Sequence, residues 1–236
     1  MKNVFLLICI VFVFQSFGQK KYSFDCALAY KEQCKLHEKP TEMIYLINTQ
    51  KNNYTLFTHQ NKDSTILSIH FRDELGVSVN GAMNKNDFYK AETITNECTQ
   101  TFRYKGLVKE NYKIENCNDT IINDTSYYHY KLFSLKSLSY QKRKNIVTAH
   151  FIVDKKNTLK YDFTMASLIF NIDSNKIEIP FGIAKTIYYT NTEGIITSKM
   201  ELNGIIKVDK YLAIPEECDY TKDEIRNYKP SVTFNR

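Results

Sequence analysis

Apolar and polar residues alternate along most of this chain. In the stretch YSFDCALAY the bulky residues share the even positions, Tyr22, Phe24, Cys26, Leu28 and Tyr30. Successive side chains of a β-strand point to opposite faces of a sheet, so this alternation predicts a strand with one apolar face. The stretch LKYDFTM, residues 159–165, follows the same rule with apolar odd positions. The run MIYLI, residues 43–47, is apolar throughout, which is typical of a central strand covered on both faces.

Turn signals separate these runs. The strongest is Asn203-Gly204, because an Asn-Gly pair readily takes the positive φ angles of a type I′ turn. It predicts a hairpin between IITSKMEL and IIKVDKYLAI. Further turns are predicted at Asn80-Gly81, Glu193-Gly194 and Asp173-Ser174-Asn175-Lys176. Roughly a dozen short, closely connected strands predict an all-β fold, a large antiparallel meander sheet that forms a curled half-barrel or a sandwich.

Two segments depart from the strand pattern. In TKDEIRNYKP, Thr221 and Glu224 have the spacing of a capping box and Pro230 ends the segment, so a short C-terminal helix is predicted. The segment NKNDFYKAE, residues 84–92, is expected to hold one helical turn. No shift in composition marks a domain boundary, and we expect residues 19–236 to form a single domain.

Charge adds little to this picture. Removal of Lys2 with the leader described below lowers the formal net charge from +6 to +5, and the remaining basic residues are spread along the chain. Lys142-Arg143-Lys144 is the one tight basic cluster, and we interpret it as a solvated turn between two strands. A nucleic-acid footprint needs a larger basic stripe, so no nucleic-acid partner is expected.

The N-terminus predicts export. Lys2 precedes an unbroken apolar run from Val4 to Phe14, and small residues follow at Ser16 and Gly18. This is the pattern of a signal peptide, residues 1–18, cleaved before Gln19. An uncleaved anchor is the alternative, but a membrane span needs roughly 20 apolar residues. No later segment is long and apolar enough to be an integral membrane segment, so we expect a periplasmic or extracellular protein.

Export makes the cysteines candidates for disulfides. Cleavage removes Cys9 from the six cysteines and leaves five, so at least one is free, intermolecular or modified. The five disulfide candidates are Cys98, Cys117, Cys26, Cys34 and Cys218.

Two pairings can be examined from spacing. Cys98 and Cys117 bracket a predicted hairpin around Gly106. In a regular hairpin their side chains point to opposite faces, whereas a bulge near its open end would bring them together, so this pairing stays open. Cys26 and Cys34 pair only if the chain turns back between them, and a buried free thiol at Cys26 is equally expected.

No metal, cofactor or catalytic site is predicted. Neither C-x-x-C nor a second Cys–His pair accompanies Cys34 and His37. The histidines form no H-x-H or H-E-x-x-H motif, and we expect each to be an ordinary sheet residue, with His70 facing solvent: His37, His59, His70, His129 and His150. Glycine loops that cradle phosphate are absent.

Nucleophile and carboxylate motifs are equally sparse. No G-x-S-x-G elbow occurs, and Ser134, Ser137 and Ser139 have no neighbouring histidine in sequence. A triad assembled by the fold stays open. We interpret Glu216, Glu217 and Asp219 as an exposed acidic loop, and Asp173, Asn175 and Glu178 as an incomplete calcium pattern inside a hairpin turn. The protein is expected to be a non-enzyme.

A family resemblance extends this interpretation. A short signal followed by hairpins rich in Tyr, Lys and Asn is similar to exported bacterial β-sheet proteins of unknown function. The ending GIAKTIYYTNTEGIITSKMELNGIIKVDKYLAIPEEC, about a sixth of the 236 residues, resembles the terminal hairpins of curled-sheet families akin to periplasmic lipoprotein carriers. The resemblance implies a half-barrel sheet that holds an acyl chain or another apolar ligand, and the first hypothesis below adds a lipidated protein as a possible partner. It implies no site residue.

Three functional hypotheses follow. The first is an exported, non-enzymatic β-sheet protein that binds a lipid, another apolar ligand or a lipidated protein partner in a curled sheet. The second is a structural or protein-interaction module of the cell envelope with a filled core. The third is a hydrolase whose triad the sequence does not reveal. The ligand and the oligomeric state do not follow from the sequence.

Overall fold

The computed structural model describes residues 20–34, 39–60, 65–73, 77–95, 101–103, 112–156, 182–215 and 218. Within them the chain forms two short helices, α2 (Lys85–Lys90) and α3 (Leu138–Lys144), and a 13-stranded sheet. The strands are β1 (Lys20–Cys34), β2 (Thr41–Asn48), β3 (Lys51–Gln60), β4 (Ile66–Asp73), β5 (Val77–Asn84), β6 (Thr93–Thr95), β7 (Thr101–Arg103), β8 (Tyr112–Asn116), β9 (Thr120–Ile122), β10 (Thr125–Ser134), β11 (Thr148–Asp154), β12 (Ala184–Thr190) and β13 (Ile196–Ile214).

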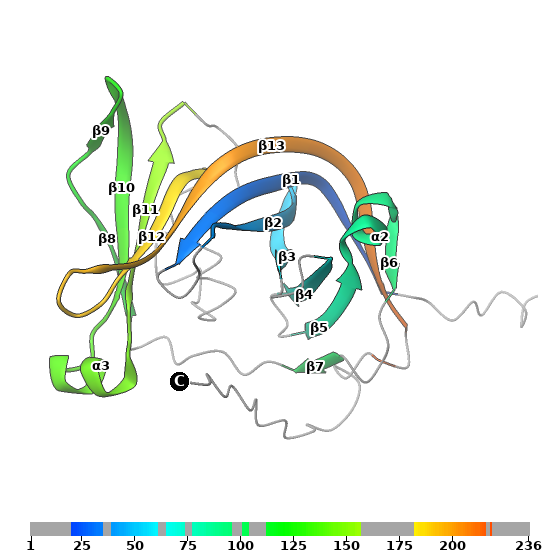
Figure 1. The fold of residues 1–236 in the computed structure, drawn as a ribbon, viewed down its shortest axis with the longest axis horizontal. Coiled ribbons are helices and arrows are strands. Elements are labelled where there is room, and N and C mark those ends of the chain that lie inside the picture. Colours follow the sequence, from blue (N-terminus) through cyan, green and yellow to red (C-terminus); the bar gives the residue numbers. More distant parts are fainter. Residues whose placement is uncertain are drawn as a thin grey trace, which may run out of the picture.

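The strands follow one another as a curled antiparallel meander. Their order is β7-β5-β4-β3-β2-β1-β13-β12-β11-β10-β8, with β9 beside β10 and the short β6 parallel to the end of β13. Figure 1 shows β13 and β1 curving together as an arch over β2 to β5. The predicted all-β, curled sheet is therefore confirmed.

Both faces of the central strands are buried. In β2, Ile44 and Leu46 belong to one hydrophobic cluster, whereas Tyr45 and Ile47 belong to another on the opposite face. We call these the first and second core clusters, and their faces of the sheet the first and second faces. The prediction that residues 43–47 form a central strand covered on both sides is confirmed.

Strand β1 changes face partway along its length. Tyr22 and Phe24 lie in the first core cluster, but Cys26, Leu28 and Tyr30 lie in the second. The prediction that these five residues share one face is therefore wrong. The register of β1 against β13 shifts between Phe24 and Cys26, and an irregularity of this kind breaks the two-residue alternation of a strand.

Two predicted turns are wrong for a common reason. Strand β13 runs unbroken through Asn203-Gly204, and β5 runs through Asn80-Gly81. Gly204 pairs with Ala29 and Gly81 with Ile69, so ladder hydrogen bonds to a neighbouring strand override the local turn preference of Asn-Gly.

The turn at Glu193-Gly194 is confirmed. Gly194 has φ +79°, in the left-handed region that glycine adopts without a side-chain clash. Its backbone N–H donates to the carbonyl of Asn191, 3.0 Å away, and closes the connection between β12 and β13. The turn predicted at residues 173–176, the strand at 159–165 and the C-terminal helix lie outside the described residues.

The two short helices differ in how well the sequence predicts them. The predicted helical turn in residues 84–92 is confirmed as α2, whose N-cap Asn84 accepts from the N–H of Asn86. The basic cluster Lys142-Arg143-Lys144 is not a simple turn, because it forms the last turn of α3 between β10 and β11. Basic side chains at this C-terminal end interact favourably with the negative end of the helix dipole.

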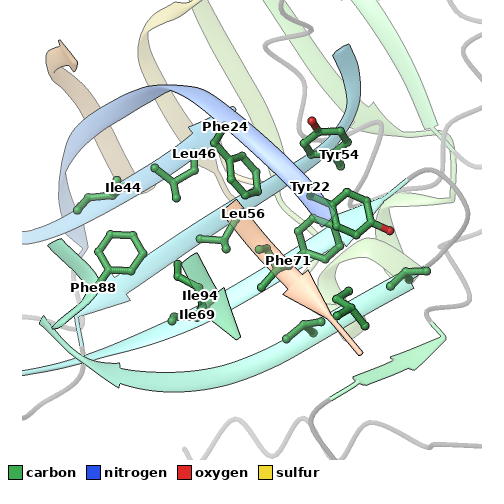
Figure 2. Packing of buried hydrophobic residues seen from close by; sticks show 14 of the residues in the cluster. Tyr22, Phe24, Ile44, Leu46, Tyr54, Leu56, Ile69, Phe71, Phe88 and Ile94 are labelled. Carbon is green, nitrogen blue, oxygen red and sulfur yellow. The ribbon is translucent and has the colours of Figure 1, made fainter. Parts of the chain in front are cut away.

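The first core cluster is closed by α2 and β6. Phe88 of α2 is 1% exposed and Ile94 of β6 is 4% exposed, and both pack against residues of β1 to β5. Figure 2 shows these two side chains beside Ile44, Leu46, Leu56 and Ile69, with the rings of Tyr22, Tyr54 and Phe71 gathered at the other end of the cluster. Tyr22 and Phe71 contact each other with ring centroids 4.5 Å apart.

One buried hydroxyl in this region has no hydrogen-bond partner. Thr58 is fully buried between Ile44 and Ile69, its neighbours on the adjacent strands, and its Oγ1 is unsatisfied. We expect Thr58→Val to raise the free energy of unfolding by about 1 kcal/mol, because valine keeps the shape and removes the desolvated hydroxyl. Urea unfolding measures this.

Thr55 in the same strand is the matched control. It is 2% exposed, and its Oγ1 donates to the carbonyl of Leu46 over 3.2 Å. Thr55→Val therefore leaves a buried bond unmade and should lower stability by about 1 kcal/mol. If both variants changed the free energy of unfolding equally and with the same sign, the unsatisfied Thr58 hydroxyl and the bonded Thr55 hydroxyl would not differ as the structure indicates.

Lys210 ties α2 to the long strand β13. Its Nζ donates to the carbonyls of Phe88, Tyr89 and Ala91 at the C-terminal end of the helix, where a cation is favoured. We expect Lys210→Met to lower the free energy of unfolding by about 1 kcal/mol. Lys207→Met, which changes an exposed lysine of the same strand, should leave stability within about 0.5 kcal/mol of the parent in urea unfolding.

Candidate functional site

A row of aromatic side chains crosses four neighbouring strands on the second face. We call Tyr30 of β1, Tyr45 of β2, Phe57 of β3 and His70 of β4 the aromatic row. Successive ring centroids are 5.4, 5.9 and 4.9 Å apart. Tyr45 pairs with Phe57 and Phe57 with His70 in the strand ladders, so register alone brings the rings together.

The buried end of the row is anchored by hydrogen bonds to the other half of the sheet. The Tyr30 hydroxyl donates to the carbonyl of Ala184, 2.7 Å away, and the Tyr45 hydroxyl contacts the Met200 sulfur at 3.7 Å. Ala184 and Met200 belong to β12 and β13. These contacts hold the two tyrosine rings in place and satisfy hydroxyls that would otherwise be costly to bury.

Exposure increases along the row. Tyr30 and Tyr45 are 3% and 4% exposed, whereas Phe57 and His70 are half-buried. The second core cluster as a whole has a margin of partly buried apolar side chains, Met43, Phe57, Tyr112, Ile114, Tyr130, Tyr189 and Leu202. The row therefore runs from a closed core to a margin where apolar atoms meet water.

The exposed end of the row is polar and uncharged. His70 stacks on Phe57, lies 5.1 Å from the stacked ring of His59, and its Nδ1 is hydrogen-bonded to Asn80 Oδ1 at 3.0 Å. Burial lowers the pKa of His70 below its usual value. As expected, His70 lies on the face of β4 opposite Leu67, Ile69 and Phe71, but it is half-buried rather than fully exposed because Phe57 and His59 stack on it.

A second group of polar side chains lies on the opposite face of β10, β11 and β12. We call His129, His150, Tyr188 and Thr190 the histidine group. His129 Nε2 is 3.0 Å from His150 Nδ1, and His150 Nε2 is 3.2 Å from Thr190 Oγ1. The ring of His150 stacks on that of Tyr188 with centroids 4.4 Å apart and an interplanar angle of 3°.

Both histidines of this group favour the neutral form. Burial is the main cause that lowers the pKa of His150 to about 4, and the charges of His129 and Lys131 add to it. The pKa of His129 is also lowered, first by burial and then by Lys131. Near neutral pH the rings are therefore a neutral pair that shares one N–H···N hydrogen bond.

The sequence did not predict this group because the two histidines are far apart in it. His129 and His150 are brought together by the β10–β11 ladder, in which Lys131 pairs with His150 and His129 lies diagonally across. Their sequence numbers give no signal of their own, because the register across the β10–β11 connection decides which residues of the two strands share a face.

The predicted serine candidates do not meet a histidine. Ser134 is buried and its Oγ accepts from the N–H of Lys136, while the hydroxyls of Ser137 and Ser139 bond each other. His70, His129 and His150 make none of their hydrogen bonds to serine or carboxylate. His37, the acidic residues Glu216, Glu217 and Asp219, and the group Asp173, Asn175 and Glu178 lie outside the described residues.

The cysteines resolve part of the disulfide question. Cys26, Cys34 and Cys117 have free thiols. Of the alternatives that the spacing left open, neither the Cys98–Cys117 nor the Cys26–Cys34 disulfide is formed, and Cys26 is a buried free thiol. Cys117 lies beyond the end of β8, where its N–H donates to the carbonyl of His129, and β1 runs extended from Cys26 to Cys34. Cys218 is disulfide-bonded and buried in the first core cluster, and its partner and Cys98 lie outside the described residues.

Metal and membrane features are sparse in the part of the chain that the structure describes. No three or more His, Cys, Asp or Glu side chains converge there as a metal site. None of the helices described there has the length and apolar character needed to cross a membrane.

No protein-family model matches the chain, and no curated protein matches it. Similar solved structures include an outer membrane lipoprotein-sorting protein domain from Vibrio parahaemolyticus, 10% identical with TM-score 0.33, over 78% of this chain and 85% of that chain. A LolA superfamily protein from Nitrosomonas europaea is 12% identical with TM-score 0.30, over 79% and 86%. PNGF-II is 11% identical with TM-score 0.39, over 87% of this chain and 32% of that chain. The chain thus has a weak resemblance to lipoprotein-sorting domains.

The histidine group should make stability depend on pH. The pKa of His150 is about 4 in the folded protein, against an ordinary value of about 6.5, so the unfolded chain binds a proton more readily between these values. We expect the stabilisation to be complete above about pH 6.5 and to be lost as the pH falls towards 4.

Urea unfolding of the parent and of His150→Gln at pH 7 and pH 4.5 tests this. Carboxylates titrate in both proteins, so the difference between the two isolates His150. The loss of stability on acidification should be smaller in the variant. An equal loss in both proteins would show that His150 does not carry the effect.

Proposed function

We propose that this chain is an exported, single-domain, non-enzymatic β-sheet protein that binds an apolar ligand, such as an acyl chain, along the aromatic row of the second face. The observation that carries the proposal is the change in exposure along that row, from the buried Tyr45 to the half-buried Phe57 and His70. An apolar chain bound at the exposed end of the row would cover the half-buried rings and extend the apolar contacts of the second core cluster.

Hydrophobic burial supplies the driving force for such binding. Each buried methylene contributes roughly 0.8 kcal/mol, so a few methylenes against Phe57 and its neighbours outweigh a modest loss of chain entropy. Methionine side chains adapt to irregular apolar shapes, and Met43 and Met200 both belong to this face. His70 and Asn80 offer uncharged polar atoms where the head of an amphiphile would lie.

The leader supports an exported location. Residues 1–18 have the three-part pattern of a signal peptide, and a carrier of apolar ligands is useful in an aqueous compartment between membranes. We place the mature chain, residues 19–236, in the periplasm or outside the cell.

An interaction module of the cell envelope is the second candidate, and it rests on a different observation. β12 pairs with β13 up to Glu201 and β6 pairs with it from Tyr211, and no described strand covers the β13 edge between them. Ile205 and Ile206 in that stretch are 50% and 55% exposed. An open strand edge with exposed apolar residues is a site where another chain can add a strand.

Binding of a fluorescent long-chain acyl probe to the full mature protein tests the carrier proposal. Phe57→Ala removes one half-buried ring of the row, so we expect it to weaken binding by about 1 kcal/mol, which is about fivefold in Kd. Ile121→Ala removes an apolar side chain that is 73% exposed on β9 and should leave binding unchanged. Circular dichroism checks that both variants fold.

Native mass spectrometry of the exported protein gives an independent outcome. A non-covalent adduct of lipid size, absent from the denatured protein, supports the carrier. A bare native mass that stays unchanged after incubation with lipid, together with no saturable probe binding, would reject the carrier in favour of the interaction module.

A further inference from the structure

We propose that His129 and His150 form a site for one divalent transition-metal ion on the face of the sheet opposite the aromatic row, with water completing the coordination shell. The site is independent of the proposed ligand function, because Leu132, Phe151 and Ile187 of the same strands point to the second face. The argument rests on the distance between two ring nitrogens and on what holds each ring.

The two nitrogens already stand at the separation that a shared ion requires. Imidazole nitrogen lies about 2.0–2.1 Å from a bound zinc ion, so two ligands are about 3.3 Å apart in a tetrahedral shell and about 3.0 Å apart at the right angle of an octahedral shell. His129 Nε2 and His150 Nδ1 are 3.0 Å apart in a hydrogen bond, so the two nitrogens face each other, and the rings are inclined by 35° rather than stacked. An ion there would take the place of the N–H···N hydrogen bond, and the proton of His129 Nε2 would move to Nδ1 of the same ring, so that both imidazoles stay neutral ligands.

Thr190 and Tyr188 fix the tautomer and the ring plane of His150, as neighbouring groups do for metal-binding histidines. The Thr190 hydroxyl, 3.2 Å from Nε2, can accept its N–H and leaves Nδ1 as the lone-pair nitrogen that faces His129. A hydrogen bond from the second ring nitrogen is the usual device that fixes the tautomer of a metal-binding histidine. The stacked ring of Tyr188 fixes the plane, and its hydroxyl lies 3.3 Å from His129 Nε2.

The charged groups around the pair do not prevent binding. Lys131 is the cation next to it on β10, and its Nζ forms an ion pair with Glu115 of β8 at 3.1 Å. Cys117, just beyond the end of β8, donates its N–H to the carbonyl of His129, and burial raises the pKa of its thiol.

His59 and His70 provide a matched control within the same chain. Their rings stack with centroids 5.1 Å apart and an interplanar angle of only 10°, so their lone pairs lie in two nearly parallel planes and do not meet at one ion. His70 Nδ1 is also engaged with Asn80. Two neighbouring histidines are therefore present at both places, and only the first pair has the geometry of a chelate.

The experiment titrates the full mature protein, purified without a histidine tag, with Ni²⁺ and with Zn²⁺ in competition with a chromophoric chelator. We expect one ion per chain, and at least tenfold weaker binding in both His129→Gln and His150→Gln. The double variant His59→Gln/His70→Gln and the single variant Cys117→Ser should bind as the parent does. Circular dichroism in the absence of metal reports whether each variant folds.

Each outcome decides the proposal. Loss of binding in both His129→Gln and His150→Gln, with the two controls unchanged, supports it. No saturable binding by the parent, unchanged binding in His150→Gln, or a tenfold loss in Cys117→Ser would overturn it. Acyl-probe binding should be the same with and without the metal, so failure of this site and failure of the proposed carrier are distinguishable.

Discussion

The antiparallel pairing of β1 with β13 is the interaction on which the rest of the sheet depends. It joins the first described strand to the last, from Lys20 opposite Ile214 to Cys34 opposite Ser198. On the other side of β1 the sheet continues with β2 to β5, and on the other side of β13 it continues with β12, β11, β10 and β8. Because this ladder is so non-local in sequence, folding requires nearly the whole chain, and we expect it to be slow for a domain of this size.

The same ladder sets which residues meet on each face. Its register shift near Asp25 transfers the apolar residues of β1 from the first face to the second, so one strand contributes to both core clusters. Tyr22 and Phe24 complete a core closed by α2 and β6, whereas Leu28 and Tyr30 begin the face that carries the aromatic row. The second shift, at Asn203, adds a residue to β13 opposite Ala29 and Tyr30.

The two faces consequently offer different chemistry. The aromatic row presents apolar rings whose burial decreases towards His70, which suits an amphiphile with a long apolar part. The histidine group presents convergent nitrogens beside hydroxyls on the other side of a single layer of strands. A single layer of strands lets the proposed ligand site and the proposed ion site lie on opposite faces without sharing a residue. In β11, for example, Phe151 belongs to the second core cluster and its neighbour in sequence, His150, belongs to the histidine group.

The sequence by itself determined the fold class, the buried strand at residues 43–47, the helical turn of α2 and the turn at Gly194, because each depends on alternation, capping or backbone conformation within a few residues. It did not determine the fate of Asn80-Gly81 and Asn203-Gly204, where pairing with a distant strand outweighs a local turn preference. Nor could it assemble the aromatic row or the pair His129 and His150, since strand register decides both. Register is a property of the tertiary structure, because a shift of one residue moves every side chain of a strand to the other face.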